Sequence, residues 1–195
     1  NISVDPIFPN LFRFHHDIQV DVELAEAMHD SAAESGIITK MMRNQDFRVD
    51  YGTIVSCHML NPDWDKPIVT ISSNRSTHYY SNEVMNEQAA ALGKAVIKAI
   101  EDSGKKVVLV ASHSLSHRHF VTEAPLPEDM SREHIYNHSQ YVWDMKLVQM
   151  MREGKMREVI DILPEMIEQT MAEAEGGGLS WMMAAMGYPD YPAEI

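Results

Sequence analysis

A strand–helix–strand pattern between residues 67 and 111 is the feature that most limits the folds open to this chain. An apolar, β-branched run at 67–72 (PIVTIS) precedes a helical pattern at 82–103, and a second such run follows at 106–111 (KVVLVA). A long helix between two strands is the usual crossover between parallel neighbours, and its hand is right-handed. The sequence therefore predicts an α/β fold, with a mixed or mostly parallel central sheet flanked by helices.

The region before this pattern adds one strand and one helix. An apolar run at 37–41 predicts a strand. Residues 21–35 (DVELAEAMHDSAAES) carry Glu23 and Glu26 in the first turn, where carboxylates complement the helix dipole. Gly36 follows, and glycine commonly ends a helix. We therefore expect a helix over 21–35.

From about residue 131 the chain becomes helical, which predicts a helical C-terminal part. One helical pattern covers 131–154 and ends at a glycine. Two more, at 156–163 and 165–174, lie on either side of Pro164, which predicts a break because proline cannot donate the helical hydrogen bond. Three glycines at 176–178 predict a further break.

The length, composition and cysteine content of the chain predict a single domain and a cytoplasmic location. With 195 residues, 45% of them hydrophobic, the chain can bury a core as a single domain over 1–195. Its one cysteine, Cys57, cannot form an internal disulfide, and no signal peptide or apolar run of about 18 residues occurs. A cytoplasmic protein is expected.

Charge and motifs exclude several function classes. A net charge of −13 would repel nucleic acids and anionic membranes, so neither is an expected partner. The sequence contains no GxGxxG, GxxxxGK[ST], HExxH, GxSxG or CxxC motif. These absences disfavour nucleotide binding and the familiar hydrolases, and they leave a small ligand as the expected partner.

Three histidines follow the run at 106–111 and are candidates for chemistry. Ligands of α/β sheets collect at the carboxyl ends of strands, where His113, His117 and His119 are expected. Imidazole titrates near neutrality, so one of these histidines at the strand tip could act as an acid and base. Alternatively, His113 and His117 could bind zinc, or the histidines could simply occupy a loop.

An Asp-Tyr-Gly sequence at 50–52 is a second candidate. We expect Gly52 to adopt a positive φ in a turn that Asp50 helps to fix. The phenol of Tyr51 could then hydrogen-bond a polar atom of a substrate. It could equally place its ring in the core and its hydroxyl at the surface.

Glu173 is a third candidate because its helical position faces inward. It lies three residues after Thr170 and seven after Met166, on a mainly apolar face. A carboxylate turned into a core must be paired or must bind a cation, because an isolated buried charge is too costly. A structural salt bridge and a metal ligand are therefore both open.

Several of these segments together resemble the class III (LigB-type) extradiol ring-cleaving dioxygenases. The most specific matches are Leu-Ser-His at 115–117 and Asp-Tyr-Gly at 50–52, in that family's order and separation. The resemblance covers nearly the whole chain. Its other matching segments are DVELAEAM, PIVTISSN, KKVVLVASHSLSH and GGGLSWMMAAMGYP.

The resemblance implies a non-haem Fe(II) enzyme that opens an aromatic ring with O2. The iron would be held by two histidines and one carboxylate. Glu173 would be that carboxylate, His117 would be the acid/base group and touch the substrate, and Tyr51 would bind the substrate. Many catechol-cleaving relatives carry Asp-His-Gly where this chain has Asp-Tyr-Gly. The tyrosine supports 2-aminophenol as the substrate, with 2-aminomuconic 6-semialdehyde as the product. A substituted aminophenol or catechol is the wider substrate class that the resemblance implies.

The same resemblance implies that this chain is a fragment of a longer protein. The family's two histidine ligands would lie upstream of Asn1, together with N-terminal βα elements. A homologous subunit in a hetero-oligomer is the implied partner. Two other functions stay open: a non-catalytic paralogous subunit or binding module on the same fold, and a zinc-dependent hydrolase using His113 and His117.

Overall fold

Contacts within the chain divide it into two compact units. The first contains Asn1–Asn74 and Ala95–Ser112, and the second contains Arg75–Lys94 and His113–Ile195. Whether the whole chain acts as one domain over 1–195 stays a prediction. The structure, a computed structural model, describes residues 3–4, 18–44, 48–72, 80–116, 138–170, 172 and 176–195.

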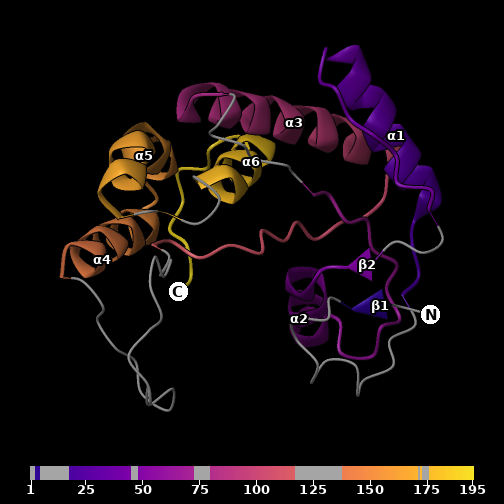
Figure 1. The fold of residues 1–195 in the computed structure, drawn as a ribbon, viewed down its shortest axis with the longest axis horizontal. Helices are drawn as coiled ribbons and strands as arrows, with labels where there is room; N and C mark the ends of the chain where they lie inside the picture. The colour runs from indigo at the N-terminus through magenta and orange to yellow at the C-terminus, as the bar shows by residue number, and fades with distance from the viewer. Residues whose placement is uncertain are drawn as a thin grey trace. The chain divides into compact units, whose positions relative to one another are not determined.

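Two predicted helices, α1 (Val22–Glu34) and α3 (Asn82–Ser103), are confirmed (Figure 1). Asp21 caps α1, because its carboxylate accepts a hydrogen bond of 3.0 Å from the backbone N–H three residues later. Gly36 and Gly104, which follow the two helices, have φ of +78° and +65°. This left-handed backbone suits glycine and ends both helices. Among the described residues, no helix is both long and apolar enough to cross a membrane.

Helix α1 packs beside the C-terminal part of α3 in the first unit. The Ser31 hydroxyl donates a hydrogen bond of 2.8 Å to the Ala95 carbonyl oxygen, and both residues are buried. Leu24 and Met28 lie on the same buried face of α1. This face follows helical spacing, so the sequence pattern that predicts α1 also determines which side it buries.

The turn predicted at 50–52 is wrong, because these residues begin a helix, α2 (Tyr51–Leu60). The Asp50 carboxylate caps α2 by accepting a hydrogen bond of 2.9 Å from the Thr53 N–H. Gly52 lies in the first helical turn and is not among the glycines with positive φ. A Cβ on Gly52 would lie 2.9 Å from the Ser112 hydroxyl oxygen. Close packing therefore explains this glycine better than backbone freedom does.

The described residues do not form the predicted central sheet. Their one sheet pairs the two-residue strands β1 (Ser3–Val4) and β2 (Arg48–Val49) in parallel. The runs at 37–41, 67–72 and 106–111 form no strand, although one isolated parallel bridge joins Val20 to Ile68. A strand exists only when a neighbour pairs with its backbone, and beyond this bridge the described residues supply no such neighbour for these runs.

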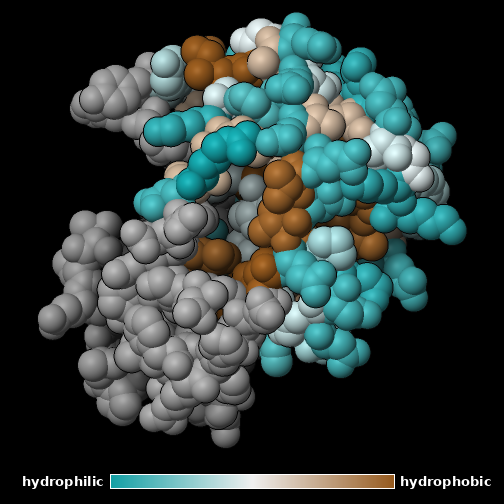
Figure 2. All heavy atoms as spheres, turned by 90° about the vertical axis from the view of Figure 1, so that its right-hand side faces the viewer, coloured by the Kyte–Doolittle hydropathy of each residue, from teal (hydrophilic) through white to brown (hydrophobic). Residues whose placement is uncertain are grey.

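Side-chain exposure agrees with this missing sheet. Val108 is 82% exposed and Ile38 is 99% exposed, whereas a sheet covered by helices would bury both. Figure 2 shows hydrophobic residues at the surface of one face, between hydrophilic ones. The prediction of a central sheet flanked by helices is therefore not borne out within the described residues.

The second unit has a helical core built from α4 (His138–Arg152), α5 (Met156–Thr170) and α6 (Gly177–Ala185). Gly154, with a φ of +77°, ends α4 as predicted, although residues 131–137 lie outside the described part. The buried cluster of this core comprises Leu147, Met156, Val159, Leu163, Met166, Ile167, Ala172, Leu179 and Met183.

The predicted break at Pro164 is wrong, because α5 continues through it. Proline removes one helical hydrogen bond, but Leu163 and Met166 beside it are fully buried in the core. Packing of this strongly amphipathic face outweighs the lost bond. The predicted break is confirmed at Gly176, which has a φ of +69° and directly precedes α6. The next two glycines already belong to α6.

Gly93 brings the backbones of α3 and α6 into direct contact within the second unit. A Cβ at this position would lie 2.3 Å from the carbonyl oxygen of Trp181 and 3.0 Å from the backbone nitrogen of Ala185. Real Cβ atoms do not approach so closely, so a glycine is required here. A hydrogen bond of 3.1 Å from the Ser180 hydroxyl to the Asn86 side-chain oxygen joins the same two helices.

Candidate active site

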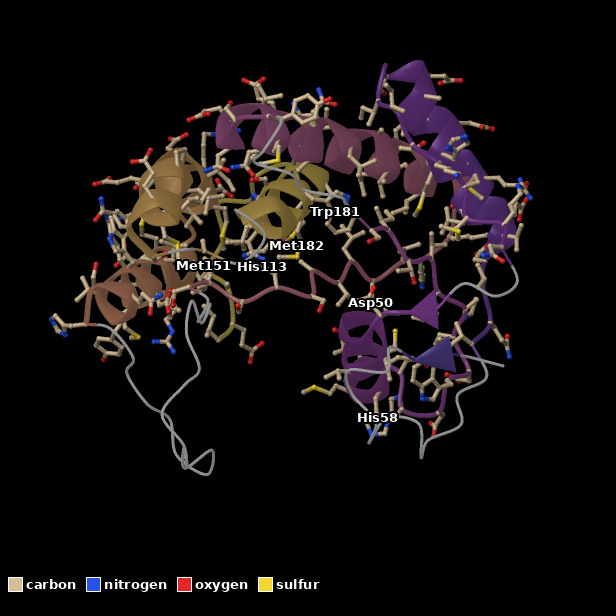
Figure 3. The ribbon with its side chains drawn as sticks, viewed as in Figure 1. Asp50, His58, His113, Met151, Trp181 and Met182 are labelled. Atoms are coloured by element: carbon tan, nitrogen blue, oxygen red, sulfur yellow. The ribbon has the colours of Figure 1, made fainter. Side chains whose placement is uncertain are left out.

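The segment 113–116, which leads to His117, is held against the helical core of the second unit. His113, labelled in Figure 3, packs on the first turn of α6. A Cβ placed on Gly178 would lie 3.1 Å from the Cβ of His113 and 3.3 Å from its Nδ1. Leu115 packs against the buried cluster. A glycine in α6 and an apolar side chain in the segment thus fix its course.

Ser116 is held by Asp144 and by a backbone bridge. Its backbone N–H donates to one carboxylate oxygen of Asp144 at 2.9 Å, and its hydroxyl donates to the other at 2.6 Å. An isolated antiparallel bridge also pairs Ser116 with Ala172. One carboxylate on α4 and one bridge therefore restrain both the backbone and the side chain of Ser116.

The three predicted site residues are not described as side chains. His117 and Glu173 lie outside the described residues, and of Tyr51 the structure describes the backbone, at the start of α2. The structure does bring together their chain neighbours, because Ser116 directly precedes His117 and Ala172 directly precedes Glu173. The bridge therefore lies one covalent step from each of these two residues.

The described residues do not by themselves fit a metal site. No three His, Cys, Asp or Glu side chains in this part of the chain come together so that they could hold an ion. Glu173, the carboxylate that the resemblance assigns to iron, is outside it. Of the two histidines in the zinc alternative, His113 alone is described, and its ring packs on Gly178.

A cysteine nucleophile is not favoured by the structure. Cys57 lies on α2 and is partly buried. Burial raises the pKa of its thiol above the ordinary value of 9.0, because the thiolate would lose solvation. The thiol therefore stays protonated at neutral pH, whereas nucleophilic chemistry needs the thiolate.

Asp144 is a residue of this region that the sequence analysis missed. It lies on α4 between buried Gln140 and buried Leu147, at steps of four and three residues. This spacing places it on the inward face of the helix, where its carboxylate reaches Ser116. The sequence argument for Glu173, an inward carboxylate on a helix that needs a partner, holds for Asp144 on α4. For Glu173 the predicted helix over 165–174 is too long, because α5 ends at Thr170.

Comparison with known proteins decides the family. Residues 7–194 match the family described as the catalytic LigB subunit of aromatic ring-opening dioxygenase. The chain belongs to the LigB family. The predicted resemblance is thereby confirmed, and with it the α/β class of this family, although the described residues lack its central sheet.

Three relatives of this LigB chain place it further. It is 51% identical over 193 residues to a 2-aminophenol 1,6-dioxygenase beta subunit from a Pseudomonas species, covering 99% of the chain and 63% of the relative. It is 26% identical over 173 residues to 3,4-dihydroxyphenylacetate 2,3-dioxygenase of Escherichia coli, covering 89% and 59%. With a Pseudomonas 2-aminophenol 1,6-dioxygenase alpha subunit it shares 25% identity over 187 residues, covering 95% and 65%. The LigB chain thus spans about three fifths of these relatives.

Proposed function

We propose that this protein cleaves the ring of 2-aminophenol, or of a substituted aminophenol or catechol, with O2 at a non-haem Fe(II) site. The 51% identity to a beta subunit of a 2-aminophenol 1,6-dioxygenase carries the proposal. Asp-Tyr-Gly at 50–52 supports an aminophenol, because the resemblance implies a histidine in the middle position for many catechol-cleaving members of the family. The bridge between Ser116 and Ala172 supports one site that includes both of the following residues, His117 and Glu173.

The proposed roles follow the residue types. Glu173 would be the carboxylate ligand of Fe(II), with two histidines of the longer protein expected from the resemblance. When bound, the metal supplies coordination positions for the substrate and O2. Tyr51 would hydrogen-bond the bound substrate through its phenol. His117 would contact the substrate and act as acid and base.

The reaction requires a group that both accepts and donates a proton. The substrate hydroxyl must lose a proton early, and a proton must be delivered to oxygen as the O–O bond breaks. The bond between the hydroxyl-bearing carbon and its unsubstituted ring neighbour breaks. One atom of O2 enters the carboxyl group and the other enters the aldehyde of the product, 2-aminomuconic 6-semialdehyde. An imidazole near neutral pKa serves both proton steps with little loss of driving force, which is the role proposed for His117.

The proposal extends to assembly, fold and location. A homologous subunit is the proposed partner, because the chain is similar both to a beta subunit and to an alpha subunit. We propose that the apolar runs at 37–41, 67–72 and 106–111 join a mostly parallel sheet in the longer protein. The parallel bridge from Val20 to Ile68 supports this pairing for the second run. A cytoplasmic location is proposed from the sequence.

The substitution His117→Ala tests the acid/base role. Turnover of 2-aminophenol should fall about 10²- to 10⁴-fold, the usual loss for a positioned acid/base group, while KM changes little. Oxygen uptake by the Fe(II)-loaded full-length protein, alone and with its partner subunit, measures turnover. The matched control is His119→Ala, which removes a histidine two positions later and should keep wild-type turnover. Unchanged turnover in His117→Ala would remove His117 from the mechanism.

The same assay separates the alternatives. A non-catalytic subunit would take up no oxygen with Fe(II) on its own, and the uptake of its assembly with an active partner would be unchanged by His117→Ala. A zinc-dependent hydrolase would take up no oxygen but would regain hydrolytic activity with Zn²⁺. Either result would overturn ring cleavage as the function of this chain.

A further inference from the structure

Asp144 and Ser116 form a two-point contact that the proposed mechanism has not used. The Ser116 N–H and hydroxyl both donate to Asp144, one to each carboxylate oxygen, at 2.9 Å and 2.6 Å. Hydrogen bonds to a charged acceptor are stronger than neutral ones. Two of them to one residue restrain its backbone and its side-chain rotamer at once.

The helix that carries Asp144 is itself firmly anchored. Leu147, three residues later on α4, is fully buried in the core of the second unit. Gln140, four residues earlier, is buried and donates a hydrogen bond of 2.9 Å to the Thr170 carbonyl oxygen at the end of α5. The carboxylate therefore projects from a rigid support and not from a loop, which makes it suited to hold another residue in place.

Two further contacts hold the same short segment. Leu115 packs on the buried cluster, and Ser116 pairs with Ala172. These contacts fix the position of the segment, but neither reaches the Ser116 hydroxyl. Asp144 thus restrains the peptide plane and the side-chain rotamer of Ser116, the residue that directly precedes His117.

We propose that Asp144 is a positioning residue: by binding the N–H and hydroxyl of Ser116, it orients the imidazole of His117 for proton transfer. This inference rests on the proposed role of His117 in ring cleavage. A misplacement of about 1 Å can cost on the order of 10²-fold in rate, so a restraint one residue away can matter as much as a direct contact.

Three variants separate positioning from charge. Asp144→Ala removes both hydrogen bonds. Asp144→Asn keeps both, because its amide oxygen can accept from the Ser116 N–H while its NH2 donates to the Ser116 hydroxyl oxygen. Ser116→Ala removes one bond and leaves the other. The matched control is Asp161→Ala, which removes an exposed carboxylate from α5.

The expected kinetic result is a split between kcat and KM. Asp144→Ala should lower kcat on the order of 10²-fold with KM within about threefold, because the substrate still binds but the proton acceptor is misaligned. Asp144→Asn should restore kcat to within about tenfold of wild type, and Ser116→Ala should fall between them. Asp161→Ala should match wild type. If folded Asp144→Ala keeps wild-type kcat, or if Asp144→Asn is as slow as Asp144→Ala, the positioning role is refuted.

A readout that does not depend on activity separates this inference from the proposed function. In ¹⁵N-histidine-labelled full-length protein, the ring resonances of His117, assigned by their loss in His117→Gln, should show one conformer in wild type and in Asp144→Asn. In Asp144→Ala they should show exchange between conformers. An inactive wild type with this pattern would refute the proposed function and retain the role of Asp144 in orienting His117. Ring resonances that Asp144→Ala leaves unchanged would overturn that role, and should Asp144→Ala not fold, Ser116→Ala provides the same comparison.

Discussion

The second unit buries large apolar side chains, whereas the first unit leaves comparable ones exposed. In the second unit, α4, α5 and α6 close around a core in which Leu147, Leu163 and Met166 are essentially inaccessible. In the first unit, the β-branched runs leave Ile38 and Val108 in solvent. A helix satisfies its own backbone and needs only one covered face, whereas an extended run needs a paired neighbour before it can be buried. Burial in this protein therefore follows local hydrogen bonding more than apolar composition.

The largest effect that tests this comparison comes from two leucines. Leu147→Ala, at a side chain with 0% exposure, should destabilise the protein by about 2–5 kcal/mol, because it leaves a cavity in the second unit. Leu60→Ala, at the 65% exposed end of α2, should change stability by less than about 0.5 kcal/mol. Urea unfolding followed by circular dichroism measures both.

The result for Leu60→Ala tests whether the exposed face of α2 is covered in solution. A loss at Leu60 as large as that at Leu147 would mean that a further segment or subunit covers α2 in solution. The contrast between the units would then belong to the isolated chain alone.

Two glycines with the same backbone give a second comparison. Gly36 in the first unit and Gly154 in the second have φ of +78° and +77°. A Cβ on Gly36 meets nothing within 4 Å, whereas one on Gly154 would lie 2.6 Å from the Asp190 carbonyl oxygen. Gly36→Ala should cost about 1–2 kcal/mol of backbone strain, and Gly154→Ala should add roughly 1–3 kcal/mol from overpacking. Equal shifts in thermal midpoint would show that residue 190 is not held against Gly154.

The smallest effect concerns an exposed ion pair of the first unit. The Lys105 ammonium binds the Asp21 carboxylate at 2.8 Å and lowers its pKa below the ordinary value of 3.8, with help from the Leu24 N–H. A lowered folded-state pKa means that the unfolded chain binds the proton more readily. The stabilisation is therefore complete above pH 3.8 and is lost as the pH falls through the folded value.

Lys105→Met should accordingly be slightly less stable than wild type at pH 7, and this difference should shrink both in acid below pH 3.8 and in high salt. Urea midpoints across pH 7 to 2 provide the measurement. Asp21→Asn is the control, since asparagine keeps the cap of α1 and removes the charge. If the difference in stability between Lys105→Met and wild type changes with neither pH nor salt, the Lys105–Asp21 ion pair is not its cause.

Prediction of the fold succeeded where the signal was local. Gly36 marks the predicted end of α1 through its own backbone conformation, and the structure confirms that end. The strands failed because pairing depends on partners far along the chain. Pro164 shows the reverse case: its local signal is real, but packing of the buried face of α5 overrides it.

For the site, the sequence identified the family but not the support of the site. Leu-Ser-His at 115–117 and Asp-Tyr-Gly at 50–52 indicated the LigB family, which the comparison confirms. His117, Glu173 and the Tyr51 side chain stay predictions, because the structure does not describe them. Asp144 was predictable in principle from its spacing to Leu147, yet nothing in the sequence named Ser116 as its partner, 28 positions away.

The close contact at Gly93 limits which second mutations could compensate for a substitution there. Its neighbours across the gap are the backbone oxygen of Trp181 and the backbone nitrogen of Ala185, so the obstacle to any larger residue is main chain. Trimming a nearby side chain cannot make room, and a second-site suppressor of a lesion at this position would have to move an entire helix. At ordinary core positions a smaller neighbouring side chain can compensate for a larger residue. At Gly93, where α3 contacts α6, no such substitution can compensate.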